Sequence, residues 1–322
     1  MILAPRTFSM AKRAIKNYFS KRPFCVSFEV THRCNARCLH CHLGGPVEEK
    51  RASPQRYGEI CRKIKPLVAQ LSGGEPLLRK DLEQIVKALR IPNGAPYIVI
   101  TTNGVLLTKE KYYRLRQAGT DEISLSLDYP DERHDEFRRV PGLFTRIETL
   151  VRELDSDNHK AITLCCVIQS DNFRELPQMA ELARKWNVKI NFSAYTPLRT
   201  KDKKYMILKE DFDEFREILK KLLRFKKKHK NIYTSDYIFK RMIEFFDKGF
   251  IPKCLTGEKF YNVNPDATFS PCGLIITDYK SPKELFHNFV KKNTCTYCYT
   301  AIRGNSEKPA KYLVLDSLRA IR

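Results

Sequence analysis

Apolar and polar residues follow two different periods along this chain, and the two periods alternate. Short apolar runs rich in β-branched and aromatic residues have the length of strands, and the first of them covers residues 24–31. Between these runs lie longer stretches in which apolar residues recur every three or four positions, which is typical of one buried face of a helix. The predicted strands cover 24–31, 67–71, 96–102, 122–127, 161–168 and 188–194, and the predicted helices cover 53–64, 80–90, 108–118, 143–153 and 173–186.

This alternation of strands and helices predicts an α/β fold. Consecutive strands joined by helices pair in parallel through right-handed crossovers. The six predicted strands are too few to close an eight-stranded TIM barrel, so we expect a partial (β/α)6 TIM-like barrel with a wide lateral mouth. In β/α barrels the chemistry lies at the carboxyl ends of the strands, where the loops converge.

Three further segments flank the barrel. We expect a basic amphipathic N-terminal helix in residues 1–22, the barrel in 23–196, a helical connector in 197–250 and a small C-terminal β-hairpin/helix subdomain in 251–322. The hairpin strands are predicted at 258–264 and 267–271, because a Pro-Asp-Ala turn separates two short apolar runs. The connector carries two predicted helices, at 210–228 and 234–247.

The N-terminal helix has an apolar side that two different neighbours could cover. Its apolar residues are Phe8, Ala11, Ile15, Tyr18 and Phe19, and the basic residues Lys12, Arg13 and Lys16 lie towards the other side. A basic amphipathic helix can lie on an anionic membrane. Alternatively, the apolar side caps the bottom of the barrel, which is the interpretation we favour. The basic run from Lys220 to Lys230 leaves a similar choice between a contact with phosphate or membrane and a solvated helix face.

Composition narrows the class of protein. The chain has 322 residues, 42% of them hydrophobic, and no apolar run of about 18 residues that would span a membrane. Its N-terminus lacks the features of a signal peptide. Eleven cysteines without an export signal favour a reducing, cytoplasmic compartment and metal ligation over disulfides. The net charge of +22 predicts attraction to anionic groups such as phosphates or lipid headgroups, and a peripheral membrane contact is compatible with it.

The strongest chemical signal follows the first predicted strand. Cys34, Cys38 and Cys41 have the spacing C-x3-C-x2-C. A cubic iron–sulfur cluster has four irons that each take one thiolate, so three clustered thiolates leave one iron open to chelate a small molecule and pass it an electron. Two alternatives stay open at this point. One is a zinc site completed by a nearby histidine, and the other is three buried structural thiols.

A second group of cysteines lies in the C-terminal region. Cys254 and Cys272 stand alone, and Cys295 and Cys298 form a C-x2-C pair. Four thiols suit a fully ligated site, which zinc or an iron–sulfur cluster could fill. The remaining cysteines lack ligand spacing and are expected to be ordinary buried residues; they are Cys25, Cys61, Cys165 and Cys166.

The first cysteine motif resembles the cluster loop of the radical S-adenosylmethionine (SAM) superfamily. Other strand ends agree with that family. Ser72 to Pro76 resembles its GGE motif, Thr101 to Gly104 its TNG motif, and Ser126 to Asp128 its SLD segment. The resemblance implies that the open iron of a [4Fe–4S] cluster binds SAM. Electron transfer then cleaves SAM to methionine and a 5′-deoxyadenosyl radical.

The resemblance also implies which residues contact SAM. His40 stands where the family usually has an aromatic residue beside the adenine, and Gly73, Gly74 and Glu75 correspond to the segment that binds the SAM ammonium group. The implied cofactor-binding residues are His40, Gly73, Gly74, Glu75, Asn103, Ser126 and Asp128. Tyr129 replaces the family's usual glycine. No catalytic residue is assigned.

The C-terminal cysteines resemble the twitch subdomain, the shortened form of the SPASM extension of many radical SAM enzymes. The resemblance implies one auxiliary [4Fe–4S] cluster held by Cys254, Cys272, Cys295 and Cys298. The full SPASM pattern needs further cysteines after the C-x2-C pair, and residues 299–322 contain none.

Together these features predict a radical SAM enzyme that abstracts hydrogen and oxidises or couples its substrate, with an electron donor such as flavodoxin or ferredoxin. The basic segments favour an anionic small-molecule, lipid or sugar substrate. Peptide or protein maturation within the same superfamily is the alternative. A nucleic-acid-binding zinc protein is the alternative from another class, although the sequence has no recognisable RNA-binding module, so we expect no nucleic acid partner.

Overall fold

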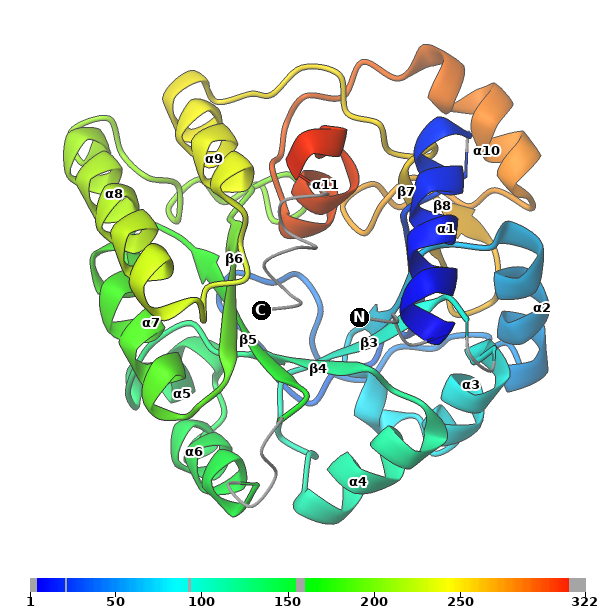
Figure 1. The fold of residues 1–322 in the computed structure, drawn as a ribbon, viewed down its shortest axis with the longest axis horizontal. Coiled ribbons are helices and arrows are strands. Elements are labelled where there is room, and N and C mark those ends of the chain that lie inside the picture. Colours follow the sequence, from blue (N-terminus) through cyan, green and yellow to red (C-terminus); the bar gives the residue numbers. More distant parts are fainter. Residues whose placement is uncertain (1–4, 21, 92–93, 155–159, 313–322) are drawn as a thin grey trace. The chain divides into compact units, whose positions relative to one another are not determined.

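The computed structural model describes residues 5–20, 22–91, 94–154 and 160–312 (Figure 1). The chain forms two compact units. Unit 1 comprises Met1–Arg37, Leu43–Ser124 and Leu255–Asn293, and unit 2 comprises Cys38–His42, Leu125–Cys254 and Thr294–Arg322. The chain passes from unit 1 to unit 2 within strand β4 (Glu122–Ser126).

Unit 1 contains a mostly parallel sheet with helices around it. Its strands are β1 (Cys25–Thr31), β2 (Val68–Gly73), β3 (Tyr97–Thr102), β7 (Phe260–Val263) and β8 (Phe269–Ser270), in the spatial order β3-β2-β1-β7-β8. Its helices are α1 (Pro5–Phe19), α2 (Pro54–Ile64), α3 (Leu82–Leu89), α4 (Lys109–Ala118) and α10 (Pro282–Asn288), with short 3-10 turns at Pro76–Leu78 and Val290–Lys292.

The central strand β1 is buried on both faces, but the two faces differ in chemistry. Phe28 has no solvent exposure and meets the ring of Tyr57 on α2 at 5.9 Å in an edge-to-face arrangement. On the other face Ser27 is hydrogen-bonded to Ser72 of β2 at 2.7 Å, and Glu29 accepts from the amide of Asn262 on β7 at 2.5 Å. Because side chains alternate along a strand, β1 presents an apolar surface to the helices and a polar one to the opposite side.

Local signals fix where several helices begin and end. The Ser53 side chain accepts from the N–H of Arg56 at the start of α2, and that helix ends at Lys65 in a left-handed conformation. Thr108 caps α4 in the same way, and Gly119, with φ of 117°, ends it. Side-chain oxygens satisfy the free N–H groups of a first turn, and glycine adopts the left-handed conformation without steric penalty.

Unit 2 continues the pattern of strands and helices. Strands β5 (Ile162–Ile168) and β6 (Lys189–Ala194) pair in parallel, with Cys165 opposite Asn191. The helices are α5 (Arg133–Arg138), α6 (Leu143–Glu153), α7 (Leu176–Lys185), α8 (Phe212–His229), α9 (Asp236–Lys248) and α11 (Ala301–Ser306), with a 3-10 turn at Phe173–Glu175. Helix α8 packs against both α7 and α9 (Figure 1).

The predicted α/β fold is confirmed, since the six predicted strands all form and helices follow them in the predicted order. The predicted C-terminal hairpin is observed as the antiparallel pair β7 and β8, with Val263 opposite Phe269. Its first strand also pairs in parallel with β1, placing Phe260 opposite Cys25. The boundaries predicted at 196 and 250 stay predictions.

The favoured interpretation of the N-terminal helix is wrong. Phe8, Ile15 and Phe19 of α1 are 65%, 63% and 83% exposed, so most of this apolar side does not pack on the barrel; Tyr18 at its edge does contact Phe24, with ring centres 6.2 Å apart. The opposite side of α1 faces the protein because Asn17, which is fully buried, donates to the carbonyl oxygens of Pro23 (2.8 Å) and Lys65 (3.1 Å). In the part of the chain that the structure describes, no helix is long and apolar enough to cross a bilayer.

Candidate cluster and cofactor site

The loop after β1 carries the three cysteines of the C-x3-C-x2-C motif. In unit 1, Cys34 exchanges backbone hydrogen bonds with Gly45. In unit 2, the N–H of Cys41 donates to the carbonyl of Cys38 at 3.1 Å, and Leu39 donates to the carbonyl of Phe137 at 3.0 Å. Cys38 is buried, and Cys34 and Cys41 are partly exposed.

Nitrogen donors approach two of these sulfur atoms. In unit 1 the side-chain amide of Asn103 lies 3.8 Å from Cys34 Sγ and also donates to Asn35 at 2.8 Å. In unit 2 the guanidinium of Arg138 lies 3.7 Å from Cys38 Sγ. Hydrogen-bond donors around a ligand atom orient it and tune the metal that it binds. The surroundings of Cys34 and Cys38 therefore suit cluster ligands.

The GGE segment at the end of β2 is shaped by close backbone approach. A side chain at Gly73, whose φ is 130°, would lie 2.0 Å from the carbonyl oxygen of Thr31, and one at Gly74 would lie 2.1 Å from that of Arg33. Only glycine fits both positions. The two glycines thus hold the end of β2 against the residues that lead into the cysteine loop.

Glu75 is completely buried and its carboxylate organises the neighbouring strand end. It accepts hydrogen bonds from the N–H of Leu77 (2.9 Å), the hydroxyl of Thr102 (2.7 Å) and the N–H of Asn103 (2.7 Å). The bond to Asn103 fixes the residue whose amide approaches Cys34. Glu75, Asn103 and Cys34, which are far apart in sequence, are therefore brought together in unit 1.

Asp128 is the buried carboxylate that binds the residue near Cys38 in unit 2. Its buried carboxylate forms an ion pair with Arg138 at 2.6 Å and accepts from the N–H of Val167 at 3.0 Å. Burial alone would raise the pKa of Asp128, but the positive surroundings, foremost the charge of Arg138, outweigh it and keep the pKa below its ordinary value. Arg138 therefore stays charged while it contacts Asp128 on one side and Cys38 on the other.

His40, the residue before Cys41, lies flat against an aromatic ring. Its imidazole stacks on Phe137 with ring centres 4.8 Å apart and planes inclined by 7°. Burial lowers the pKa of His40 to about 4, helped by the charge of Arg138, so the ring is neutral at pH 7. Its Nδ1 atom is buried and has no hydrogen-bond partner among the described residues. A neutral, stacked imidazole with an unused ring nitrogen is suited to contact a flat heteroaromatic ligand.

Phe137 also belongs to an aromatic cluster in unit 2 that sequence inspection missed. Its ring centre lies 5.5 Å from that of Tyr129 and 5.9 Å from that of Tyr205, and Tyr195 completes the cluster. Phe137 was not singled out because its neighbours come from three separate segments of the chain. Ser126, the remaining predicted contact, is the last residue of β4 and is partly exposed.

Three of the four C-terminal cysteines lie in unit 2. The thiol of Cys254 donates a hydrogen bond to Cys295, which lowers the pKa of Cys295 to about 6 and raises that of Cys254. Burial raises the pKa of Cys298 to about 11. The fourth, Cys272, lies in unit 1, where it forms an isolated bridge with Ile275 just after β8.

Arg303 of α11 holds the C-terminal cysteine segments in place. Its side chain is fully buried and donates to the carbonyl oxygens of Cys298 (2.6 Å), Ile251 (3.0 Å) and Pro252 (3.1 Å). A buried arginine with carbonyl partners on both sides fixes their separation. Sequence inspection missed this residue, because nothing local marks an arginine with two partners that lie 52 and 51 positions away.

Across the described residues, no group of three or more His, Cys, Asp or Glu side chains converges as it would around a metal ion. The metal-ligand assignments of both cysteine groups are therefore still predictions. The same holds for the predicted SAM contacts.

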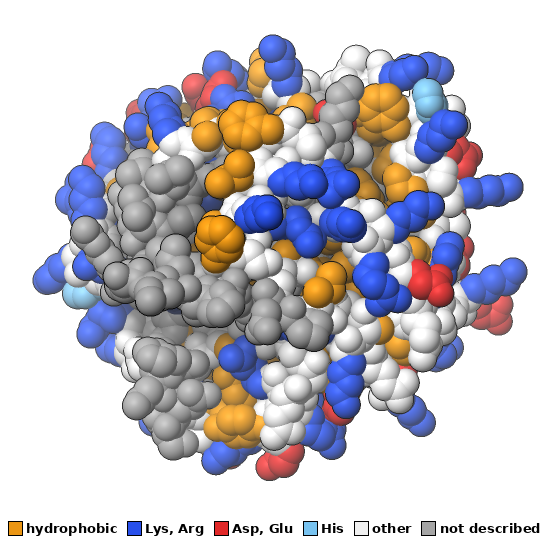
Figure 2. Space-filling model, turned by 45° about the vertical axis from the view of Figure 1, so that its right-hand side comes forward, with side chains coloured by type: hydrophobic (Ala, Val, Ile, Leu, Met, Phe, Trp, Pro, Cys, Tyr) orange, Lys and Arg blue, Asp and Glu red, His pale blue; other side chains and the backbone are white. Residues whose placement is uncertain are grey.

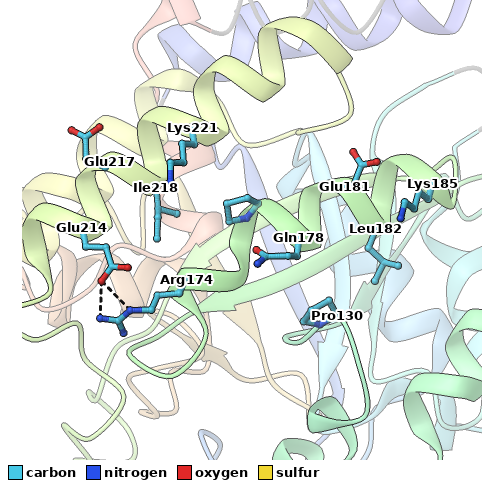
Figure 3. A pocket seen from close by; sticks show the side chains of 11 residues that line it. Pro130, Arg174, Gln178, Glu181, Leu182, Lys185, Glu214, Glu217, Ile218 and Lys221 are labelled. Carbon is cyan, nitrogen blue, oxygen red and sulfur yellow. Dashed lines mark hydrogen bonds and ion pairs between the residues drawn. The ribbon is translucent and has the colours of Figure 1, made fainter.

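Unit 2 also has a surface pocket of about 720 Å³ between α7 and α8 (Figure 3). None of the predicted site residues lines it. Arg174 at its edge pairs with Glu214 (2.8 Å) and Asp211 (2.5 Å). Since the remaining lining residues carry charges of both signs, this pocket shows no preference for one kind of charged ligand.

Comparison with known proteins defines the class. A model of the radical SAM superfamily matches residues 28–183. The PqqA peptide cyclase of Granulibacter bethesdensis is 30% identical over 277 residues, which cover 78% of this chain and 67% of the relative. A probable GTP 3′,8-cyclase of Methanococcus aeolicus is 29% identical over 202 residues, covering 59% of this chain and 66% of the relative.

Solved structures agree on the fold. The crystal structure of Streptococcus suis SuiB bound to S-adenosylmethionine aligns with a TM-score of 0.65 at 18% identity, covering 86% of this chain and 67% of SuiB. The chain spans between about a third and two thirds of the length of the curated relatives that it matches.

This chain belongs to the radical SAM superfamily. It is accordingly an enzyme of the class that uses a [4Fe–4S] cluster and SAM. The residues present fit these cofactors. Three cysteines lie in one loop, nitrogen donors approach two of them, and His40, which precedes the third, has a buried Nδ1 without a hydrogen-bond partner among the described residues.

Proposed function

We propose that this enzyme reductively cleaves SAM and uses the 5′-deoxyadenosyl radical to abstract hydrogen from an anionic substrate, which it then oxidises or couples. Cys34, Cys38 and Cys41 would hold the cluster. The observation that carries the proposal is the approach of Asn103 to Cys34 and of Arg138 to Cys38, because hydrogen-bond donors beside the sulfurs are typical surroundings of metal-bound cysteines.

When bound, the cluster supplies one electron to SAM, whose sulfonium then breaks to give methionine and the radical. The chain's own residues position the reactants. His40 would contact the adenine through its unused Nδ1, and Gly73, Gly74 and Glu75 would receive the ammonium end of SAM. Ser126, Asn103 and Asp128 would complete the binding site from the neighbouring strand ends.

We assign the four C-terminal cysteines to one auxiliary [4Fe–4S] cluster of the twitch type. The thiol contact between Cys254 and Cys295 and the anchoring of Cys298 by Arg303 support three of the four ligands. A fully ligated cluster has no open iron for substrate, so it suits an electron acceptor. The radical would take a hydrogen atom from the substrate, the auxiliary cluster would then accept one electron, and a proton would leave. The net reaction would be a two-electron oxidation of the substrate or the formation of a new bond.

Polar side chains and overall charge support an anionic small-molecule substrate. In unit 1 the face of the sheet opposite the helices carries Ser27 bonded to Ser72, Gln70 bonded to Thr101, and Glu29 bonded to Asn262. Such a polar face suits a ligand with many hydroxyl groups. The net charge of +22 would attract its anionic form. The similarity to a GTP 3′,8-cyclase agrees with a phosphorylated substrate.

A peptide substrate is the second candidate. The match to the PqqA peptide cyclase covers 78% of this chain, compared with 59% for the GTP 3′,8-cyclase, and therefore includes more of the sequence outside the barrel. In that case a separate protein would present the peptide. A reductant such as ferredoxin or flavodoxin would supply electrons in either case.

The core of the proposal is tested by incubating anaerobically reconstituted enzyme with SAM and dithionite. We expect 5′-deoxyadenosine to form, and we expect Cys38→Ala to form none above the level without enzyme. Cys61→Ala is the matched control, since Cys61 is a buried thiol of α2 outside both cysteine groups. Equal product from the Cys38→Ala variant and the unmodified enzyme would defeat the proposal.

The substrate class is tested with extract from cells grown in deuterated medium. The extract is separated into small anionic metabolites and peptides, and each fraction is added to the SAM reaction. Deuterium appears in 5′-deoxyadenosine only where the radical has taken it from a substrate. Labelling by the metabolite fraction supports the first candidate, and labelling by the peptide fraction replaces it with the second.

A further inference from the structure

Helix α1 is attached to unit 1 by its polar side. Asn17 donates to the carbonyls of Pro23 and Lys65, and Arg13 donates to that of Pro66 at 3.4 Å. Lys259 donates in turn to the carbonyls of Tyr18 and Ser20 at the end of the helix. These contacts fix the rotation of α1 about its axis, so they also fix which side faces outward.

The outward side is an apolar stripe with lysines on its flank. Phe8, Ala11, Ile15 and Phe19 follow the helical spacing i, i+3, i+7, i+11 and are all exposed. Lys12 and Lys16 are exposed next to the stripe. Large apolar side chains scattered singly on a surface need no explanation, but a contiguous row on one helix indicates a binding face.

A basic pocket begins where α1 ends. It has a volume of about 620 Å³ and is lined by Arg22 and Pro23, by residues of α2, and by residues from β7 to the start of α10. Its apolar lining includes Ile60, Ile64 and Phe269, all buried. Five of its thirteen lining residues are basic and one is acidic; the basic ones are Arg22, Arg56, Lys63, Lys280 and Lys283.

The single acidic residue of this pocket does not balance its charge. Glu59 pairs with Arg56 at 3.2 Å, which leaves four basic side chains in excess. Figure 2 turns forward the side on which Figure 1 draws α1, α2 and α10, and it shows lysine and arginine side chains gathered with hydrophobic side chains between them. An exposed apolar stripe and an excess of positive charge thus occur together in unit 1.

We propose that this surface, the exposed side of α1 together with the pocket beside Arg22, docks on an anionic lipid bilayer. The stripe of Phe8, Ile15 and Phe19 would enter the boundary between headgroups and acyl chains, as amphipathic helices do. Lys12 and Lys16 would lie at the level of the lipid phosphates. The pocket would take a phosphate headgroup between its basic side chains and its apolar lining.

Charge complementarity selects this partner over others. A second copy of the chain would bring the same basic surface against itself, which like charges oppose. A nucleic acid would use the lysines but leave the apolar stripe in water. Anionic lipid is a partner that offers negative charge at the surface and an apolar phase directly beneath it.

The test uses the full chain with its clusters, purified anaerobically, and measures co-sedimentation with vesicles. One set of vesicles is phosphatidylcholine alone, and the other contains about one third phosphatidylglycerol. We expect binding to the anionic vesicles to be at least about tenfold stronger than to the neutral ones, and to weaken as salt shortens the screening length. No binding to anionic vesicles at low salt would overturn the proposal.

Two variants locate the binding surface, each with a matched control. The first variant removes the stripe by the triple substitution Phe8→Ser, Ile15→Ser and Phe19→Ser. Its control removes three exposed apolar side chains of unit 2 by the triple substitution Leu208→Ser, Tyr233→Ser and Phe250→Ser. Lys12→Glu with Lys16→Glu reverses two charges, and Lys227→Glu with Lys228→Glu makes the same change on the exposed side of α8.

We expect each α1 variant to bind vesicles at least about tenfold more weakly, and each control variant to bind within about twofold of the unmodified enzyme. Circular dichroism and 5′-deoxyadenosine formation in solution should be unchanged in all four. Equal loss in the control variants would mean general charge attraction and would overturn the proposal. Two further results, in protein that does not bind vesicles, would also overturn the proposal. One is a dimer that the α1 variants dissociate, and the other is RNA binding that the α1 variants abolish.

This proposal and the proposed function fail in different ways. Vesicle binding does not require SAM or reductant, so it can be measured in the inactive Cys38→Ala variant. We expect that variant to bind vesicles as the unmodified enzyme does. Vesicle binding lost together with the cluster would contradict a docking surface formed by α1 and its pocket alone.

Discussion

In the first cysteine group nitrogen donors approach the sulfur atoms, whereas in the second, where Arg303 also contacts Cys298, two sulfur atoms approach each other. Asn103 lies near Cys34 and Arg138 near Cys38. In the C-terminal group the thiol of Cys254 bonds to that of Cys295. An N–H donor stabilises a thiolate without sharing its proton, while two neighbouring thiols hold a proton between them.

The two cysteine groups therefore differ in the side chains that surround their sulfur atoms. The nitrogen donors of the first group are positioned by carboxylates that the fold places independently, Glu75 in unit 1 and Asp128 in unit 2. Such donors beside sulfur agree with the proposed cluster, in which one iron would have no ligand from the protein. In the second group the sulfurs of Cys254 and Cys295 contact each other, and Arg303 anchors the backbone carbonyl of Cys298, which agrees with the proposed site in which protein supplies every ligand.

The largest expected effect comes from removing a thiol of the first group. In Cys38→Ala we expect 5′-deoxyadenosine formation to fall at least about a thousandfold, to the level without enzyme, because the electron donor to SAM is lost. Iron content should fall by about half, since only the second cluster would be left. Mass spectrometry of the nucleoside and iron analysis provide the measurements.

A result in which Cys38→Ala keeps its iron would break the distinction between the two groups. The control Cys61→Ala should keep both iron and activity, and should lose only about 1–2 kcal/mol of stability from the small cavity left in the core. Cys61 is buried on α2, so Cys61→Ala tests whether the loss of any buried thiol lowers iron content or activity.

The next largest effect is expected from removing a thiol of the second cysteine group. In Cys298→Ala we expect iron again to fall by about half, but SAM cleavage to continue, because the first group is intact. Substrate oxidation should fall at least about a hundredfold, since the substrate radical has lost its electron acceptor. The ratio of 5′-deoxyadenosine to oxidised product is the quantity to follow.

Cys166→Ala serves as the control, because Cys166 is buried in β5 and lacks ligand spacing. Metal analysis decides the nature of the second site in the same preparation. One zinc per chain in place of iron, lost in Cys298→Ala, would replace the auxiliary cluster with a structural zinc site and would leave the first group unaffected.

Much of the fold could be predicted because its signals are local. The six barrel strands and their helices are marked by apolar periodicity within each segment. The pairing of β7 with β1 could not be predicted, since Cys25 and Phe260 lie opposite each other but far apart in sequence. The orientation of α1 was predicted wrongly, because its apolar stripe is conspicuous, while the hydrogen bonds of Asn17 depend on carbonyls that only the fold supplies.

The candidate site divides in the same way. Spacing alone singled out the cysteines, and neighbouring motifs singled out Glu75 and Asp128. The partners of those carboxylates could not be predicted, because Asn103 follows β3 and Val167 belongs to β5. Arg303 carries no local signal either, and its role depends on carbonyls from a distant segment.

A third prediction concerns stability. Arg138 and Asp128 form a buried ion pair at 2.6 Å, so Arg138→Leu should leave a buried carboxylate unpaired and lower the free energy of unfolding by about 3–5 kcal/mol. Anaerobic urea unfolding measures the change. The double variant with Asp128→Asn should lose less than the sum of the single variants, because both remove the same interaction.

Arg152→Leu is the matched control for this prediction. Arg152 pairs with Glu148 at 2.8 Å on the exposed surface of α6, where an ion pair contributes only about 0–1 kcal/mol. If Arg138→Leu were as mild as Arg152→Leu, the idea that a fixed charge maintains the surroundings of Cys38 would fail.

The smallest effect is expected at the amide near Cys34. Asn103→Ala removes the donor to Asn35 and to the sulfur while leaving the backbone N–H that bonds to Glu75. We expect the cluster to bind, and SAM cleavage to slow by about three- to tenfold, the range of about one lost hydrogen bond. The resonance of the reduced cluster should shift, since hydrogen bonds to ligand sulfur tune its electronic state. Asn231→Ala loses a hydrogen bond from its side-chain amide to the carbonyl oxygen of Ala180 in unit 2. This variant should leave the cluster resonance unchanged. Identical spectra for the two variants would mean that the amide at 103 only orders the loop, and that the contrast between the two cysteine groups rests on Arg138 alone.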